Sequence, residues 1–263
     1  MKYKAVILVL ASDDECMSNT KWFFPRMKPE WRPLFPFFKR VWESYMFECP
    51  DIKVVFVYGS GSTETIKCYD LVYEDVVENN HPGMITKTMF ALNDIDSMYD
   101  YDFLIRTNLS TFWDLNKLSS RLDTLPKDNF LSGTPVDNRD REGNVYRYVA
   151  GYDMVISRDL VKRIIPYTND VIQQRVYCDM EDLSLCESFA KFLSAHRSES
   201  ESCKAIQSMM NDGVFENTLY QSMISRLSAG YDHFRVKTRT NRNVDKIIHK
   251  KLLFDIYGKH CEF

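Results

Sequence analysis

The sequence lacks a long hydrophobic run. The apolar stretch Ala5–Ala11 near the N-terminus has only seven residues, and the acidic residues Asp13–Glu15 follow it almost at once. A membrane-spanning helix needs roughly 20 apolar residues, and a secretory signal peptide needs a small-residue cleavage site after its apolar core. We therefore expect no membrane span and no targeting segment, and we interpret Ala5–Ala11 as part of a buried first strand. This predicts a soluble, cytoplasmic protein under reducing conditions.

Regular cysteine spacing is also absent. The seven cysteines are odd in number and contain no Cys-x-x-Cys pair. Zinc sites and disulfide frameworks both depend on such spacing or pairing, so we expect neither.

Positive charge is not in excess either. The formal net charge is −3, which gives no general attraction to nucleic acid, so we expect no nucleic-acid partner. The basic segment 235–251 is a local exception. It is compatible with a solvated helix face and strand edge or with a phosphate site, and the sequence alone leaves both open.

Hydrophobic residues are plentiful and follow an alternating pattern. Of 263 residues, 44% are hydrophobic and 14% aromatic, which is enough to bury a large core in one domain. Short apolar runs alternate with segments of helical spacing, which predicts an α/β fold. We expect strands at Tyr3–Ala11, Ile52–Tyr58, Asp70–Tyr73, Phe103–Thr107 and Val149–Ile156, and helices at Phe35–Phe47, Ile85–Met98, Asn116–Leu125, Arg158–Ile165 and Glu181–Leu193.

The strand Phe103–Thr107 leads directly into polar side chains. Its apolar run is typical of a strand that is buried on both faces, and it is followed by the tripeptide Asn108-Leu109-Ser110. Ligands of open α/β sheets bind at the carboxyl ends of the strands. We therefore expect Asn108 and Ser110 to line a ligand site.

Four segments of the chain then occur in a familiar order. YDLVYEDVVENNHPGMITKTMFAL, YDFLIRTNLSTFWDL, VAGYDMVISRDLVKRI and MEDLSLCESFAK together cover about residues 70–193. They resemble the successive blocks of the fringe and β-1,3-galactosyltransferase-like glycosyltransferases. The resemblance implies a GT-A-like (Rossmann-like) mixed sheet flanked by helices, in a single domain over residues 1–263. Its donor-binding half is expected at about 1–115 and its acceptor and catalytic half at about 116–263, with a solvated loop or disordered insertion at 194–202.

The block Glu181-Asp182 carries the expected catalytic group. The resemblance places Asp182 where the family has its catalytic base, with Glu181 and Gly151 on the acceptor side. Inverting glycosyl transfer needs a carboxylate to take the proton of the acceptor hydroxyl, and a helix N-terminus holds a carboxylate ionised. The alternative is that these acidic residues only cap the helix.

The resemblance also implies a donor site. Asn108 and Ser110 stand where the family has the outer aspartates of its metal-binding Asp-Asp-Asp. An amide and a hydroxyl are poorer ligands for Mn²⁺ or Mg²⁺ than carboxylates, so either the metal is dispensable or the diphosphate itself holds it weakly. Ser110 and His233 are the candidate metal ligands. Lys87, Arg106 and Ser12 are the further donor-binding candidates, the first two as cations that stabilise the departing nucleotide.

These expectations together predict an inverting glycosyltransferase. It would move a sugar from a nucleotide-sugar, most simply a UDP-sugar, to a hydroxyl of a glycan or glycoprotein acceptor. The absence of an anchor suits a bacterial enzyme, or one of a large DNA virus acting in the host cytoplasm. One alternative is a non-catalytic relative that binds a glycan or a nucleotide, and another is a nucleotidyltransferase, against which the acidic segment Ala11–Glu15 argues.

Overall fold

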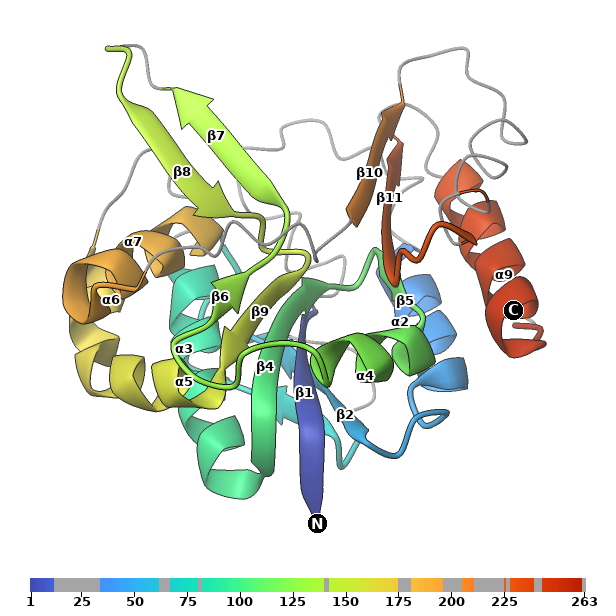
Figure 1. Cartoon of the computed structure of the whole chain (residues 1–263), viewed down its shortest axis with the longest axis horizontal. Helices are drawn as coiled ribbons and strands as arrows, with labels where there is room; N and C mark the ends of the chain where they lie inside the picture. Colours follow the sequence, from blue (N-terminus) through green and yellow to red (C-terminus); the bar gives the residue numbers. More distant parts are fainter. Residues whose placement is uncertain are drawn as a thin grey trace.

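The centre of the fold is a six-stranded mixed sheet. The computed structural model describes residues 1–11, 34–61, 67–79, 82–139, 142–174, 181–195, 205–210, 225, 228–238 and 243–261. The strand order is β3-β2-β1-β4-β9-β6 (Figure 1). The first four of these strands are mutually parallel, and β9 is antiparallel to both β4 and β6. The strands are β1 (Lys2–Leu10), β2 (Ile52–Tyr58), β3 (Asp70–Val72), β4 (Asp100–Asn108), β6 (Leu131–Ser132) and β9 (Met154–Ser157). The chain is thus a mixed α/β protein whose sheet is compatible with a Rossmann-like fold.

Helices cover both faces of this sheet. Because side chains alternate along a strand, Ile7 and Val9 of β1 enter one buried cluster, whereas Val6 and Leu8 enter the other. The first face is covered by α2 (Leu34–Tyr45), α4 (Leu115–Leu122) and α9 (Asn243–Tyr257), and the second by α3 (Gly83–Met98), α5 (Arg158–Ile164), a 3₁₀ turn (Ile165–Tyr167), α6 (Thr168–Gln173) and α7 (Glu181–Leu193) (Figure 1). This double coverage explains why the central strands are continuous apolar runs.

Two smaller sheets lie beside the carboxyl end of β4. β5 (Thr111–Trp113) follows β4 after a two-residue turn and pairs antiparallel with β11 (His233–Thr238), which pairs in parallel with β10 (Ala205–Met210). β7 (Pro135–Arg139) and β8 (Val145–Val149) form a two-stranded antiparallel ribbon that projects from the body of the molecule (Figure 1). The β5–β11 pairing therefore brings the C-terminal part of the chain to the end of the central strand.

The expected elements agree with this fold except around residue 150. The five expected helices and the strands at β1, β2, β3 and β4 are confirmed, with ends shifted by a few residues. The expected single strand Val149–Ile156 is wrong, because β8 ends at Val149, residues 150–153 form a turn, and β9 begins at Met154. Of the segment 194–202, residues 196–202 lie outside the described residues. The turn at 150–153 matters because it carries part of the site.

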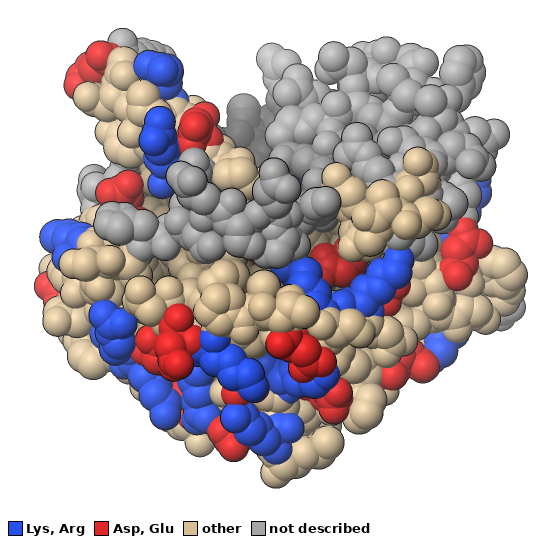
Figure 2. All heavy atoms as spheres, viewed as in Figure 1, with Lys and Arg blue, Asp and Glu red and all other residues tan. Residues whose placement is uncertain are grey.

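The surface carries both signs of charge. Figure 2 shows positive and negative side chains interspersed over the lower part of the visible face, so the described part of this face has no extended field of one sign. Among the residues that the structure describes, no helix is both long enough and apolar enough to cross a bilayer.

Candidate functional site

The end of β4 and the start of α7 meet at the carboxyl edge of the sheet. The backbone N–H of Gly151 donates to Asp182 Oδ2 over 2.9 Å, and the carbonyl oxygen of Gly151 accepts from Arg106 Nη1. The same Arg106 nitrogen donates to Asn108 Oδ1 over 2.8 Å. Asp182 and Asn108, predicted for one site from segments far apart in the sequence, therefore belong to one hydrogen-bonded network. Both side chains are half-buried.

Gly151 is held tightly between Arg106 and Asp182. A Cβ atom added at Gly151 would lie 2.5 Å from Arg106 Nη1 and 3.0 Å from the Cβ of Asp182. Since real Cβ atoms do not approach other atoms so closely, a side chain here would push the two residues apart. The lone glycine predicted for the acceptor side thus has a packing role, and it presents its N–H and C=O to the network.

Two hydrogen bonds to its backbone fix the turn after β4. The Leu109 side chain is buried, and its carbonyl oxygen accepts a hydrogen bond of 3.0 Å from Trp42 Nε1. Ser110 is half-buried, and its carbonyl oxygen accepts from the N–H of Val236 on β11 over 3.3 Å. Asn108 and Ser110 consequently lie on either side of Leu109, whose position is fixed by its buried side chain and its hydrogen bond to Trp42. Ser12, the other predicted donor contact near this edge, lies outside the described residues.

Arg106 and Glu181 form a buried ion pair beneath the site. Arg106 Nη2 lies 2.6 Å from Glu181 Oε2, and Nε donates to Oε1 over 3.3 Å. Thr88 Oγ1 donates to the same carboxylate over 2.9 Å. Burial raises the pKa of Glu181, and the Arg106 charge opposes that effect. The pair ties α3, β4 and the first turn of α7 together.

This pairing engages two residues that were predicted to contact the substrates. Arg106 and Glu181 are only 3% and 4% exposed. All five N–H groups of Arg106 point at hydrogen-bond acceptors, including Met84 Sδ at 3.8 Å. In this structure Arg106 and Glu181 hold their neighbours in position, and their contacts with donor and acceptor stay predictions.

Lys87 is a second buried cation with a similar role. Its Nζ donates to the carbonyl oxygen of Ala11 over 2.8 Å and to the Glu78 carboxylate at 2.6 and 2.8 Å. Glu78 also accepts from the backbone N–H of Gly59 over 2.6 Å. Burial lowers the pKa of Lys87, and Glu78 opposes this shift. The three hydrogen bonds of Lys87 Nζ join α3 to the residue after β1 and to Glu78, and its contact with the diphosphate stays a prediction.

His233 lies at the centre of a third buried cluster. Its Nδ1 is 2.7 Å from Asp232 Oδ1 and its Nε2 is 3.0 Å from Asp153 Oδ2. Its ring stacks on Trp113 with centroids 4.3 Å apart, and Asp232 also accepts from Arg121 Nε. Burial lowers the pKa of His233, but the two carboxylates outweigh that effect and raise the pKa above its usual value. Both ring nitrogens of His233 thus face carboxylates in this structure, and its metal-ligand role stays a prediction.

This cluster reaches the site through the turn at 150–153. Asp153 Oδ2 accepts from the N–H and the hydroxyl of Thr134, over 2.8 and 2.7 Å, and the carbonyl oxygen of Thr134 accepts from the N–H of Ala150. The next residue, Gly151, holds Asp182. The residues Asp153, Asp232 and Glu78 were not predicted. In the sequence, each of them is only an acidic residue beside a buried strand or within one of the four blocks. Such a position does not reveal a partner that is distant along the chain.

Replacing His233 with glutamine is expected to destabilise the fold most at low pH. The pKa of His233 is raised, so its charge stabilises the folded state fully below the usual histidine pKa of about 6.5, and this contribution is lost as pH rises through the folded-state pKa. Breaking such a buried pair costs about 3–5 kcal/mol. Urea unfolding at a series of pH values checks this, with His260→Gln on the exposed C-terminal side as the control. An equal loss at acid and alkaline pH would contradict a charged His233.

Asn108 and Ser110 offer a divalent cation only an amide and a hydroxyl oxygen. Within the described ranges, no cluster of three or more His, Cys, Asp or Glu side chains could hold a metal ion. In addition, Asn108 Oδ1 already accepts a hydrogen bond from the Arg106 guanidinium, so a positively charged group of the protein lies next to this oxygen.

Comparisons with known proteins add no family to this geometry. No protein-family model matches the chain, and no curated protein matches it significantly.

Proposed function

We propose that the protein is an inverting glycosyltransferase that uses a UDP-sugar and transfers its sugar to a hydroxyl of a glycan or glycoprotein. One observation carries the proposal: the carboxylate of Asp182 and the amide of Asn108 are joined through Gly151 and Arg106 at the carboxyl edge of the sheet. That edge is where α/β folds bind nucleotides. A GT-A-like fold is part of the proposal, supported by the strand order and by the four sequence blocks.

Asp182 would act as the catalytic base. It takes the proton of the acceptor hydroxyl while the acceptor oxygen forms a bond to the anomeric carbon. The bond from that carbon to the diphosphate oxygen breaks, and the nucleotide leaves with the electron pair. The hydrogen bonds from the N–H groups of Gly151 and Leu183, at 2.9 and 3.0 Å, hold the carboxylate in one orientation.

Asn108 would bind the diphosphate as a hydrogen-bond donor. Because its Oδ1 accepts from Arg106, its Nδ2 must point away from the guanidinium. Of the residues that the structure describes, none accepts a hydrogen bond from this nitrogen in the contacts we observe. An amide donor facing an anionic diphosphate supplies part of the stabilisation that a metal ion supplies elsewhere. Ser110, two residues on, would add its hydroxyl.

Donor binding is expected to depend little on metal. Titration of the purified protein with UDP-sugars, in EDTA and in Mn²⁺, should give dissociation constants within about tenfold of each other, a difference below ~1.4 kcal/mol. Asn108→Asp keeps the bond to Arg106 but replaces the amide donor by a negative charge, so it should bind the donor at least about tenfold more weakly in EDTA. A steep Mn²⁺ requirement of the unchanged protein would contradict the proposed role of Asn108.

A second candidate is a non-catalytic relative that binds a nucleotide or glycan. The observation that favours it is that internal ion pairs engage three of the predicted site residues, namely Lys87, Arg106 and Glu181. The two candidates differ in turnover: slow hydrolysis of a UDP-sugar in EDTA supports the enzyme, and binding without any hydrolysis or transfer supports the relative.

A further inference from the structure

The turn at 150–153 is also held by Thr107, the residue of β4 that follows Arg106. The side chain of Thr107 is fully buried, and its Oγ1 donates to the carbonyl oxygen of Tyr152 over 2.6 Å. Arg106 donates to the carbonyl oxygen of Gly151. Two consecutive residues of β4 therefore hold two consecutive carbonyl groups of the turn.

These two side chains reach the turn from opposite faces of the sheet. Because side chains alternate along a strand, Arg106 and Thr107 point to different faces. Arg106 is paired with the first turn of α7 on the second face, whereas Thr107 contacts Trp113, which belongs to the buried cluster of the first face. The turn is thus fixed from both faces, and it donates the N–H of Gly151 to Asp182 over 2.9 Å.

The direction of the Thr107 hydroxyl is determined by its two partners. The indole Nε1 of Trp113 is only a donor, and it donates to Thr107 Oγ1 over 3.2 Å. The carbonyl oxygen of Tyr152 can only accept. The single hydroxyl hydrogen of Thr107 therefore points at Tyr152, and the hydroxyl makes both bonds at once.

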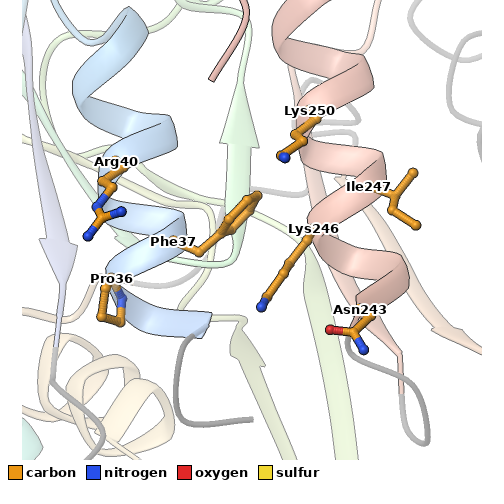
Figure 3. Close-up of a pocket in the computed structure, with 7 residues that line it drawn as sticks. All are labelled: Pro36, Phe37, Arg40, Asn243, Lys246, Ile247 and Lys250. Carbon is orange, nitrogen blue, oxygen red and sulfur yellow. The ribbon is translucent and has the colours of Figure 1, made fainter. Parts of the chain in front are cut away.

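Trp113 is itself held by the C-terminal ends of α2 and α9. Tyr45 ends α2 and Tyr257 ends α9, and their rings stack with centroids 4.8 Å apart. The backbone N–H of Trp113 donates to the Tyr45 hydroxyl over 3.4 Å, and its carbonyl oxygen accepts from the Tyr257 hydroxyl over 2.8 Å. Between the N-terminal halves of the same helices lies a groove, into which Phe37 and Lys246 extend (Figure 3). The two helices are thus in ring contact at the end that fixes the backbone of Trp113.

We propose that Thr107 is a positioning residue for Asp182. This inference rests on the proposed function, in which Asp182 is the base. Glycine has more backbone freedom than any other residue, so the direction of the Gly151 N–H depends on what holds the carbonyl groups that follow it. Loss of the Thr107 hydroxyl removes one of these two hydrogen bonds. A catalytic group displaced by about 1 Å can lose about 100-fold in rate.

Two substitutions of Thr107 separate its hydroxyl from its shape. Valine has the shape of threonine without the hydroxyl, and serine keeps the hydroxyl without the methyl group. In the full chain, Thr107→Val should lower kcat for hydrolysis or transfer of a UDP-sugar by about tenfold, while the dissociation constant of the donor changes less than about twofold. Thr107→Ser should keep kcat within about threefold of the original rate.

A threonine away from the site supplies the control. Thr168, at the start of α6, donates from its hydroxyl to the carbonyl oxygen of Ile165 over 2.6 Å, which is the same kind of bond at the same length as that of Thr107. Buried polar groups are generally hydrogen-bonded whether or not they serve a site. Thr168→Val should therefore lower the melting temperature and leave kcat unchanged. A Thr107 with a purely structural role would give this same result.

Hydrogen exchange followed by mass spectrometry gives a second measurement, which does not need turnover. Peptides that cover 150–153 should exchange at least about threefold faster in Thr107→Val than in the unchanged protein, and Thr168→Val should leave their exchange as it was. Trp113→Phe replaces Thr107→Val in both measurements where the valine variant does not fold. It removes the donor that orients the hydroxyl and should lower kcat at least about threefold.

The outcomes separate this inference from the proposed function. A kcat that is unaffected in Thr107→Val, or lowered equally in the serine variant or in Thr168→Val, would overturn the inference while turnover by the unchanged protein keeps the proposed function. An unchanged protein that neither hydrolyses nor transfers would contradict the proposed function, and with it the assignment of Thr107 to a base. Faster exchange at 150–153 in Thr107→Val would then leave Thr107 as a support of the turn alone.

Discussion

Replacing Asp182 with asparagine is expected to abolish sugar transfer while donor affinity stays nearly unchanged. The amide has the size of the carboxylate and keeps one oxygen, so it can still accept one of the two hydrogen bonds that the N–H groups of Gly151 and Leu183 donate to different oxygens of Asp182. It cannot take a proton, and a general base contributes about 10²–10⁴-fold to a rate. We therefore expect kcat to fall at least about 100-fold, measured as hydrolysis of the UDP-sugar or transfer to a glycan, with the dissociation constant of the donor preserved.

A matched substitution separates loss of the base from loss of a helix cap. Asp114 precedes α4 and accepts from the N–H of Lys117 over 3.1 Å, so it is also an aspartate at a helix N-terminus, but it is not part of the Asp182 network. Asparagine caps helices as well as aspartate does. Asp114→Asn should leave kcat unchanged, whereas an Asp182→Asn protein that still turns over at the original rate would remove the assignment of the base.

The sheet could be predicted from sequence because its strands are buried on both faces. Ala5–Ala11 and Phe103–Ile105 are uninterrupted apolar runs, and the structure buries them between two helical layers. β5 and β11 could not be predicted in this way. β5 has three residues, and its pairing with β11 joins Trp113 to His233 across more than a hundred residues of chain. Such a contact leaves no periodic signal.

The meeting of Asn108 and Asp182 could be anticipated, but the roles of the charged residues around them could not. The resemblance predicted Lys87 and Arg106 as donor-binding cations, a role that needs exposed side chains, and cations are exposed in most proteins. Their burial depends on partners that the fold supplies: Glu181 is 75 residues from Arg106, and Glu78 is nine residues from Lys87. The sequence shows that a residue is charged, and only the tertiary structure shows what neutralises it.

The buried pair leads to the second large expected effect, on stability. Arg106→Met removes the cation and leaves the Glu181 carboxylate buried without it, which is expected to lower the free energy of unfolding by about 3–5 kcal/mol. The double variant Arg106→Met/Glu181→Met should recover part of this loss, since no unpaired charge then lies in the interior. Urea unfolding followed by circular dichroism measures all three proteins. Lys4→Met, which breaks the exposed Lys4–Asp123 pair, is the control and should cost less than about 1 kcal/mol.

The pH dependence of that loss tests its cause. Burial already raises the pKa of Glu181, and Arg106 is the main influence against it. Without Arg106 the carboxyl group should protonate at a higher pH, so the ionised form costs stability above its folded-state pKa and the cost disappears as pH falls toward the usual value for glutamic acid. The difference between Arg106→Met and the unchanged protein should therefore shrink in acid. A difference independent of pH, or one that the double variant fails to reduce, would mean that Arg106 stabilises the fold by packing and that its charge does not hold the first turn of α7 in place.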